Sequence, residues 1–230
     1  MITAALLAPS SLWLGGVLYA LALLWAIWRA PWVELCSDQR RQHLLFGTVL
    51  ALFLLWLVRR DFASGLSFHF IGMTAVTLLL DCPLAVLGGA LAQLGLVLVG
   101  RQDLAALGLN GVLLVLIPVA VTELCAQWVE RRQPRNLFVY IFCCGFFPAA
   151  LTAMLCLLVG LGVLWFDGLY VMPPWLEDFI GYLWLVMFPE AFINGMAVTC
   201  LVVFYPDWLE TFNRTRYLSA PWKDEQAPRD

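Results

Sequence analysis

Long apolar runs separated by short polar segments divide the chain along its length. The runs occupy residues 11–28, 43–58, 65–80, 84–99, 104–129, 137–165 and 179–205. A helix needs about 20 apolar residues to cross roughly 30 Å of hydrocarbon. The pattern predicts an all-α fold, a polytopic membrane bundle of about seven transmembrane helices over residues 1–209. A polar tail follows at 210–230, predicted to be cytoplasmic and disordered from Ser219.

Two of these runs are short, and a polar break at Asp81-Cys82-Pro83 separates them. Proline disfavours a helical conformation in the residue before it, so the break predicts a tight turn with Asp81 as a cap or exit residue. Residues 65–80 and 84–99 form either two spanning helices or a re-entrant hairpin.

Composition supports the membrane assignment. Of 230 residues, 63% are hydrophobic and only 13% are charged, too few charges to cover a soluble domain of this size. We therefore expect a multi-pass protein of the cell membrane, such as a bacterial inner membrane, with the lipid bilayer as its surroundings and no nucleic-acid partner. The seven cysteines form no CxxC pair and are interpreted as packing residues.

Energy from ATP would have to come from another chain. The only lysine, Lys223, lies in the polar tail, so the sequence contains no GxxxxGK[ST] phosphate-binding loop.

The basic residues predict an orientation because cytoplasmic loops of membrane proteins are enriched in arginine and lysine. With seven helices, three basic residues fall on one side, Arg59, Arg60 and Arg101, and ten on the other. The ten are Arg29, Arg40, Arg41, Arg131, Arg132, Arg135, Arg214, Arg216, Lys223 and Arg229. The carboxy terminus is therefore predicted in the cytoplasm and the amino terminus outside.

His69 and Met73 are candidate metal donors. Their i, i+4 spacing places them on one face of a helix, and imidazole with thioether is a soft donor pair for a transition metal. The alternative is that His69 bonds a carbonyl while Met73 packs. In the predicted topology His69 lies ~6 Å and Asn110 ~9 Å from the outer helix ends, at 1.5 Å per residue. Both therefore fit one outward-facing cavity.

Glu190 and Asn194 are also spaced i, i+4, near the predicted bilayer middle. An ionisable residue at that depth is either functional or a structural link between helices, and the sequence leaves both readings open.

Two patches resemble the substrate-binding membrane component of cobalt and nickel energy-coupling-factor (ECF) ABC transporters. One is Ser67–Gly72 with Pro83, Gln93 and the Leu107–Asn110 run; the other is Pro189–Gly195 with Tyr205–Leu209. The resemblance implies a permease that binds a transition-metal cation as substrate, with no organic cofactor. It also implies energy from a separate transmembrane coupling protein and ATPase subunits.

The resemblance also transfers a metal-contacting histidine onto His69 and a neighbouring asparagine onto Asn110. One departure concerns the amino terminus. The family begins Met-His, and these residues hold the metal, whereas this chain begins Met1-Ile2. The family's chelate is therefore not expected here, and we predict weaker, more exchangeable binding, completed by water or backbone carbonyls.

The sequence allows two alternative functions to be weighed against transport. The first is a membrane scaffold or assembly factor for a metalloprotein, with the same fold and no transport. The second, a metal-dependent intramembrane enzyme, is disfavoured because His43 and His69, the only histidines, fall on opposite sides in the predicted topology. We therefore expect no enzyme.

Overall fold

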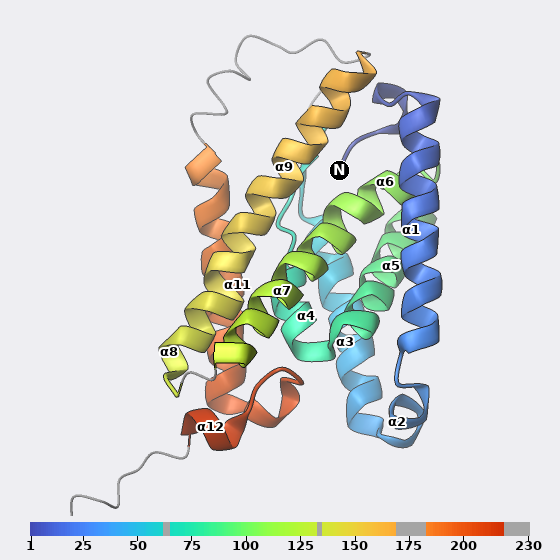
Figure 1. Cartoon of the computed structure of the whole chain (residues 1–230). Coiled ribbons are helices and arrows are strands. Elements are labelled where there is room, and N and C mark those ends of the chain that lie inside the picture. Colours follow the sequence, from blue (N-terminus) through green and yellow to red (C-terminus); the bar gives the residue numbers. More distant parts are fainter. Residues whose placement is uncertain (62–64, 133–134, 169–182, 219–230) are drawn as a thin grey trace, which may run out of the picture.

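A computed structural model describes residues 1–61, 65–132, 135–168 and 183–218, and its architecture is a bundle of long, roughly antiparallel helices (Figure 1). The helices are α1 (Pro9–Arg29), α2 (Trp32–Ser37), α3 (Gln39–Leu57), α4 (Met73–Leu80), α5 (Cys82–Leu98), α6 (Leu107–Gly111), α7 (Ile117–Arg132), α8 (Leu137–Tyr140), α9 (Phe147–Asp167), α11 (Leu183–Phe204) and α12 (Arg214–Leu218). The predicted all-α class is confirmed.

Single π-helical turns, η2 (Val112–Leu116) and η3 (Ile141–Phe146), join α6 to α7 and α8 to α9 into two long helices. Short 3₁₀ turns, η1 (Ala4–Leu6) and η4 (Pro206–Trp208), precede α1 and follow α11.

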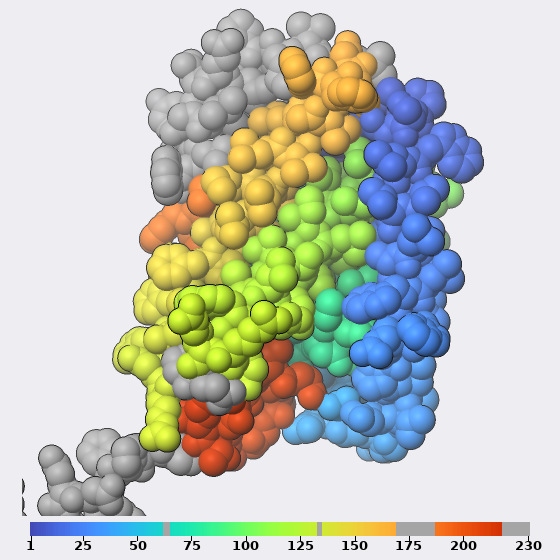
Figure 2. Space-filling model, in the orientation of Figure 1, coloured from blue at the N-terminus to red at the C-terminus, as the bar shows by residue number. Residues whose placement is uncertain are grey.

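Four helices in the described part of the chain are long and apolar enough to cross a membrane: Pro9–Arg29, Leu107–Arg132, Leu137–Asp167 and Met187–Phe204. Helix α5 is a shorter apolar helix. Many of their apolar side chains are exposed, as lipid-facing residues are, among them Trp13, Trp28 and Phe166. Figure 2 shows α1, α7 and α9 side by side over one face of the bundle. The multi-pass character is confirmed, while the count of seven and the orientation stay predictions.

The segment predicted as a helix over 65–80 is helical only from Met73, where α4 begins. Residues 65–72 before it are not helical, and Ser67–Phe68 forms the two-residue strand β2, paired antiparallel with β1 (Arg60–Asp61). Gly72 has a φ of 71°, a left-handed conformation that glycine adopts without a steric penalty and that precludes a helix continuing back toward His69. The helix face predicted for His69 and Met73 is therefore not formed.

The turn at Asp81 is confirmed. Its φ is 73°, and its Oδ1 accepts a hydrogen bond from the Leu84 amide at 3.1 Å, so Asp81 caps α5. Helices α4 and α5 thus form a hairpin, with α4 in the centre of the bundle against α5, α7 and α11.

Helices α1 and α6 cross at backbone contact distance because the crossing is lined with glycine. A Cβ on Gly15 would lie 2.7 Å from the Leu109 Cα, and one on Gly108 would overlap the backbone of Gly16. Small residues let membrane helices approach this closely. The crossing fixes α6, which carries Asn110, against the start of the chain.

The first residues enter the bundle instead of lying on its surface (Figure 1). Residues 1–3 pair with the segment before β2: the Thr3 amide donates to the Gly65 carbonyl at 3.2 Å, and the Ser67 amide to the Met1 carbonyl at 2.9 Å. The chain start therefore adds an extended segment beside the loop that carries His69.

Residues 210–218, the start of the predicted polar tail, pack against the bundle. Arg216 forms a two-pronged ion pair with Glu130 at 2.6 and 2.8 Å, and Tyr140 stacks edge-on against Phe212. The disorder predicted for 219–230 and the first residues of the helix predicted at 179–205 lie outside the described residues.

Candidate metal site

His69 lies in the non-helical segment before α4, on the wall of a partly open cavity of about 140 Å³. Its side chain is more than nine-tenths buried. The Nδ1 atom lies 2.8 Å from the Phe70 carbonyl oxygen, which can only accept, so Nδ1 carries the proton. The lone pair of the neutral ring is then on Nε2, which is buried and has no hydrogen-bond partner. In many metal sites one ring nitrogen of histidine donates a hydrogen bond to a backbone carbonyl, and the other ring nitrogen binds the metal.

Trp56 supports this segment from α3. Its side chain is fully buried, and its indole Nε1 donates to the Ile71 carbonyl at 2.9 Å. The Trp56 and His69 ring centroids lie 6.0 Å apart. The indole therefore fixes the backbone two residues after His69 and covers one side of the imidazole.

Glu190 holds the same segment from α11. Its Oε2 accepts the Ile71 amide at 2.9 Å and its Oε1 the Gly72 amide at 2.7 Å. Asn194 donates to the same Oε1 at 2.8 Å and to the Glu190 carbonyl at 2.9 Å. One carboxylate thus satisfies two consecutive backbone donors in the protein interior, where unpaired amides are costly.

Asn194 extends this interaction to α4, because its Oδ1 accepts the Ala75 amide at 3.0 Å. The first amides of a helix have no partner within the helix. Here α11 supplies partners for the start of α4, so the Glu190–Asn194 pair predicted from i, i+4 spacing acts as one unit on a neighbouring segment.

Asn110 lines the cavity, and both of its polar atoms bind the backbone of Ile2. Its Oδ1 accepts the Ile2 amide at 2.9 Å, and its Nδ2 donates to the Ile2 carbonyl at 2.9 Å. Asn110 therefore lies beside the cavity with His69, as expected, but its hydrogen bonds position the chain start.

Met1 also lines the cavity, which the sequence reasoning did not anticipate. Its amine donates to the Ser67 carbonyl at 2.7 Å, and Arg59 donates to its Sδ at 3.4 Å. Burial, and then the positive charge of Arg59, hold the pKa of the Met1 amine below its usual value. A larger fraction of this amine is therefore neutral and carries a lone pair.

Met73 lies apart from His69. Its side chain is fully buried, and its terminal methyl packs toward Gly89 of α5; it is not among the described residues that line the cavity. The donor role of Met73 stays a prediction. Cys156 of α9 does line the cavity, and its thiol donates to the Leu113 carbonyl at 2.7 Å. Nothing in the sequence distinguishes Cys156 from the other cysteines in apolar runs.

A second, polar pocket of about 160 Å³ is also lined by residues 1–3. Arg59, Arg101, Gln102 and Asp103 contribute to it, and Met1, Ile2 and Asn110 line both spaces. The chain start therefore borders both the apolar cavity and a polar pocket. Within the described ranges, no three His, Cys, Asp or Glu side chains cluster as a closed metal site would require.

These features define a class: a multi-pass membrane protein with a buried, donor-bearing cavity between its helices. The chain belongs to the CbiM family, described as the cobalt uptake substrate-specific transmembrane region, whose model matches residues 2–208. It is therefore a membrane component of transition-metal uptake whose substrate is a metal ion, and not an enzyme. Membership of the family also implies partner subunits.

Two crystal structures share the fold. One, of a truncated transition metal transporter, matches with a TM-score of 0.64 and 18% identity over 88% of this chain and 98% of that one. The other, of a transition metal transporter, has a TM-score of 0.62 and 18% identity over 87% and 91%. Comparison with curated proteins found no match.

Replacing Glu190 tests whether its hydrogen bonds to the Ile71 and Gly72 amides support both the stability of the fold and metal binding. Glu190→Gln should lower the free energy of unfolding by about 1–3 kcal/mol, because an amide presents only one acceptor oxygen to two backbone donors. Metal binding should weaken as well, because the His69 segment loses an anchor. Thermal unfolding in detergent and calorimetric metal titration measure the two effects.

Glu123→Gln is the matched control. Glu123 accepts one bond, from Gln127 of the same helix, at 2.9 Å. Equal unfolding temperatures and affinities for the two variants would show that Glu190 does not anchor the site.

Proposed function

We propose that this protein is the substrate-binding permease component of an ECF-type importer for a transition-metal cation of the cobalt or nickel kind, and that His69 contacts the metal. The observation that carries the proposal is the buried, unpartnered Nε2 of His69 on the cavity wall, with its proton fixed on Nδ1 by the Phe70 carbonyl. Family membership supports uptake as the task.

The chemistry of the nitrogen fits such cations. A neutral imidazole nitrogen is a good ligand for nickel, cobalt, copper and zinc and a poor one for magnesium or calcium. Met1 lines the same cavity as His69, and its amine donates to the carbonyl of Ser67, two residues before His69, so a second nitrogen belongs to this part of the chain. Asn110 acts indirectly by holding Ile2, and through it Met1, at the cavity wall.

Replacing the metal contact tests the assignment. His69→Ala should weaken binding of Ni²⁺ or Co²⁺ by about 10-fold or more, since the imidazole is the principal free donor. Isothermal titration of the purified protein measures this, with thermal unfolding as a check of folding.

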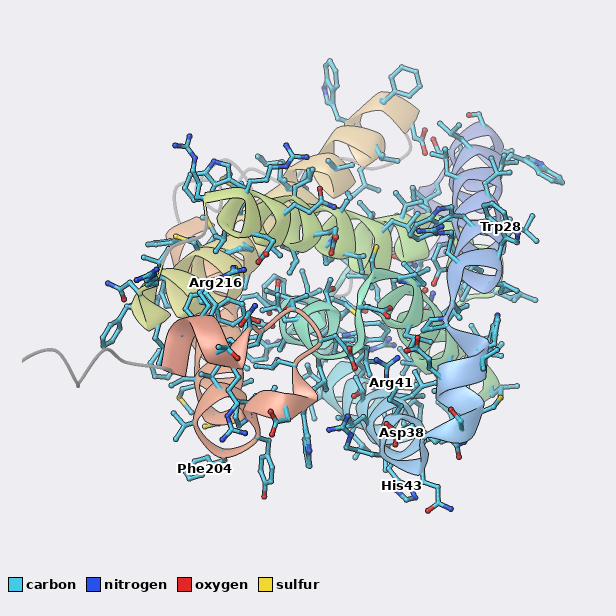
Figure 3. The ribbon with its side chains drawn as sticks, turned by 60° about the horizontal axis from the view of Figure 1, so that its bottom comes forward. Trp28, Asp38, Arg41, His43, Phe204 and Arg216 are labelled. Atoms are coloured by element: carbon cyan, nitrogen blue, oxygen red, sulfur yellow. The ribbon has the colours of Figure 1, made fainter. Side chains whose placement is uncertain are left out.

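His43→Ala is the control. His43 is exposed, and it lies at the end of the bundle where Arg41 and Arg216 gather (Figure 3). If His69→Ala binds metal as tightly as His43→Ala does, the metal contact lies elsewhere. A wild type that binds no transition metal, either as the bare ion or as a complex with a small organic ligand, would favour the scaffold function.

The orientation proposed is amino terminus outside and carboxy terminus in the cytoplasm. Arg41 and Arg216 lie at the end of the bundle that Figure 3 brings forward. Arg40 pairs with Asp38 at the same end, and Arg214 begins α12, the helix that contains Arg216. The cavity and the polar pocket beside residues 1–3 would then face outward, toward incoming metal. A reporter active only in the cytoplasm should work when fused after Asp230 and be silent when inserted at residues 169–178; the reverse pattern would invert the entry side.

Energy is proposed to come from a separate transmembrane coupling protein and ATPase subunits, because this chain has no phosphate-binding loop. The purified protein should hydrolyse no ATP, and concentrative metal uptake into cells should require co-expressed coupling and ATPase subunits. Accumulation against a metal gradient by the protein alone in liposomes, with no ion gradient imposed, would contradict this.

A further inference from the structure

The hydrogen-bond partners of the cavity wall limit what the cavity can bind. Most polar side chains on the wall are already engaged: Asn110 with Ile2, Glu190 with the Ile71 and Gly72 amides, and Cys156 with Leu113. Among the described lining residues, His69 Nε2 is the buried side-chain nitrogen or oxygen without a partner. The remaining wall is largely apolar and includes Leu113, Ala153, Gly160 and Leu164.

A bare divalent cation is poorly matched to such a wall. Transition-metal ions take about four to six ligands, and this cavity offers one free imidazole nitrogen and the adjacent Met1 amine, which already donates to Ser67. Water could complete the shell only if the wall had partners for it, and moving a hydrated, doubly charged ion against apolar side chains carries a large desolvation cost. The one carboxylate on the described wall, Glu190, is occupied by three N–H donors.

A cation that brings its own ligands avoids both problems. Two singly charged chelating ligands neutralise a divalent ion, supply four donors and leave an open position for one imidazole nitrogen. Size limits the chelate to a small one. A cavity of about 150 Å³ lined by apolar side chains holds benzene, which has six non-hydrogen atoms, and this cavity has about 140 Å³. A metal with two ligands of five non-hydrogen atoms each therefore fills the cavity and extends into its open side.

We propose that the cavity takes its transition metal as a small, uncharged organic chelate, with His69 Nε2 completing the coordination sphere. The inference rests on the proposed function in that it requires His69 to contact the metal. It deepens that function by naming the form of the substrate: a divalent ion with two bidentate, singly anionic ligands of the aminocarboxylate type.

Glycine with Ni²⁺ is a suitable probe because bis(glycinato)nickel is neutral and small. At fixed total nickel, glycine in modest excess lowers the concentration of free ion. If the chelate is the ligand, the apparent affinity of the purified protein in calorimetry should rise as glycine is added. If the bare ion is the ligand, it should fall, and the inference is overturned. Glycine without nickel should give no binding heat.

A pair of glycine substitutions on α9 tests whether the cavity itself holds the chelate. A methyl group added at Gly160 would extend into ordinary contact with Ile2 and Leu113, at 3.6 and 3.7 Å, whereas one at Gly162 has no neighbour within 4 Å. Gly160→Ala should therefore fold normally and weaken nickel–glycine binding by about fivefold or more, since the cavity loses volume. Gly162→Ala should bind like wild type, and equal affinities for the two variants would contradict the inference.

His69→Ala separates failure of this inference from failure of the proposed function. Loss of binding in this variant, combined with a fall in affinity on adding glycine, would leave His69 as the metal contact and reject the chelate. Unchanged binding of both nickel forms by His69→Ala would reject the metal contact, and the chelate with it.

Discussion

The structure depends on one carboxylate in the interior of the bundle. Glu190 accepts hydrogen bonds from two consecutive amides, those of Ile71 and Gly72, which lie 119 and 118 residues away in the sequence. A non-helical segment inside a membrane protein has backbone donors that are satisfied neither by water nor by hydrogen bonds within its own helix. Glu190 on α11 accepts the Ile71 and Gly72 amides, and this lets the chain remain non-helical up to Met73. Because His69 is in that segment, the buried position of its imidazole follows from how the backbone is held.

The same principle operates at the chain start. Asn110 binds both the amide and the carbonyl of Ile2, and the Ser67 backbone binds Met1 in the same way. These bonds involve only main-chain atoms of residues 1 and 2. The glycine-lined crossing of α1 and α6 lies next to Asn110 in the sequence, so the close packing of these two helices helps to place Asn110 where it can bind Ile2.

The sequence allowed the class of fold to be predicted because apolar runs of membrane length are unambiguous, and the turn at Asp81 followed from the proline two residues on. It did not predict the non-helical segment at 65–72. An apolar segment buried in protein has the same hydropathy whether it is helical or extended, and the i, i+4 spacing of His69 and Met73 suggested a helix that Gly72 ends. The hydrogen-bond partners of Asn110 and Glu190 could not be predicted either, because the partners are backbone atoms more than 100 residues away in the sequence. The sequence showed which polar residues in apolar runs were important, but it did not show which groups they bind.

At position 2 the side chain on the cavity wall can change while the backbone hydrogen bonds that hold the residue stay the same. Because Asn110 binds only the main-chain amide and carbonyl of Ile2, these two bonds do not depend on the chemistry of the residue-2 side chain. The resemblance implies an imidazole there, whereas this chain has an aliphatic side chain, which offers no metal donor and adds apolar surface to the cavity wall. In the proposed function His69 is the remaining histidine of the site. An apolar wall of this kind favours a metal whose other ligands cancel its charge, which is the physical reason for the proposed chelate.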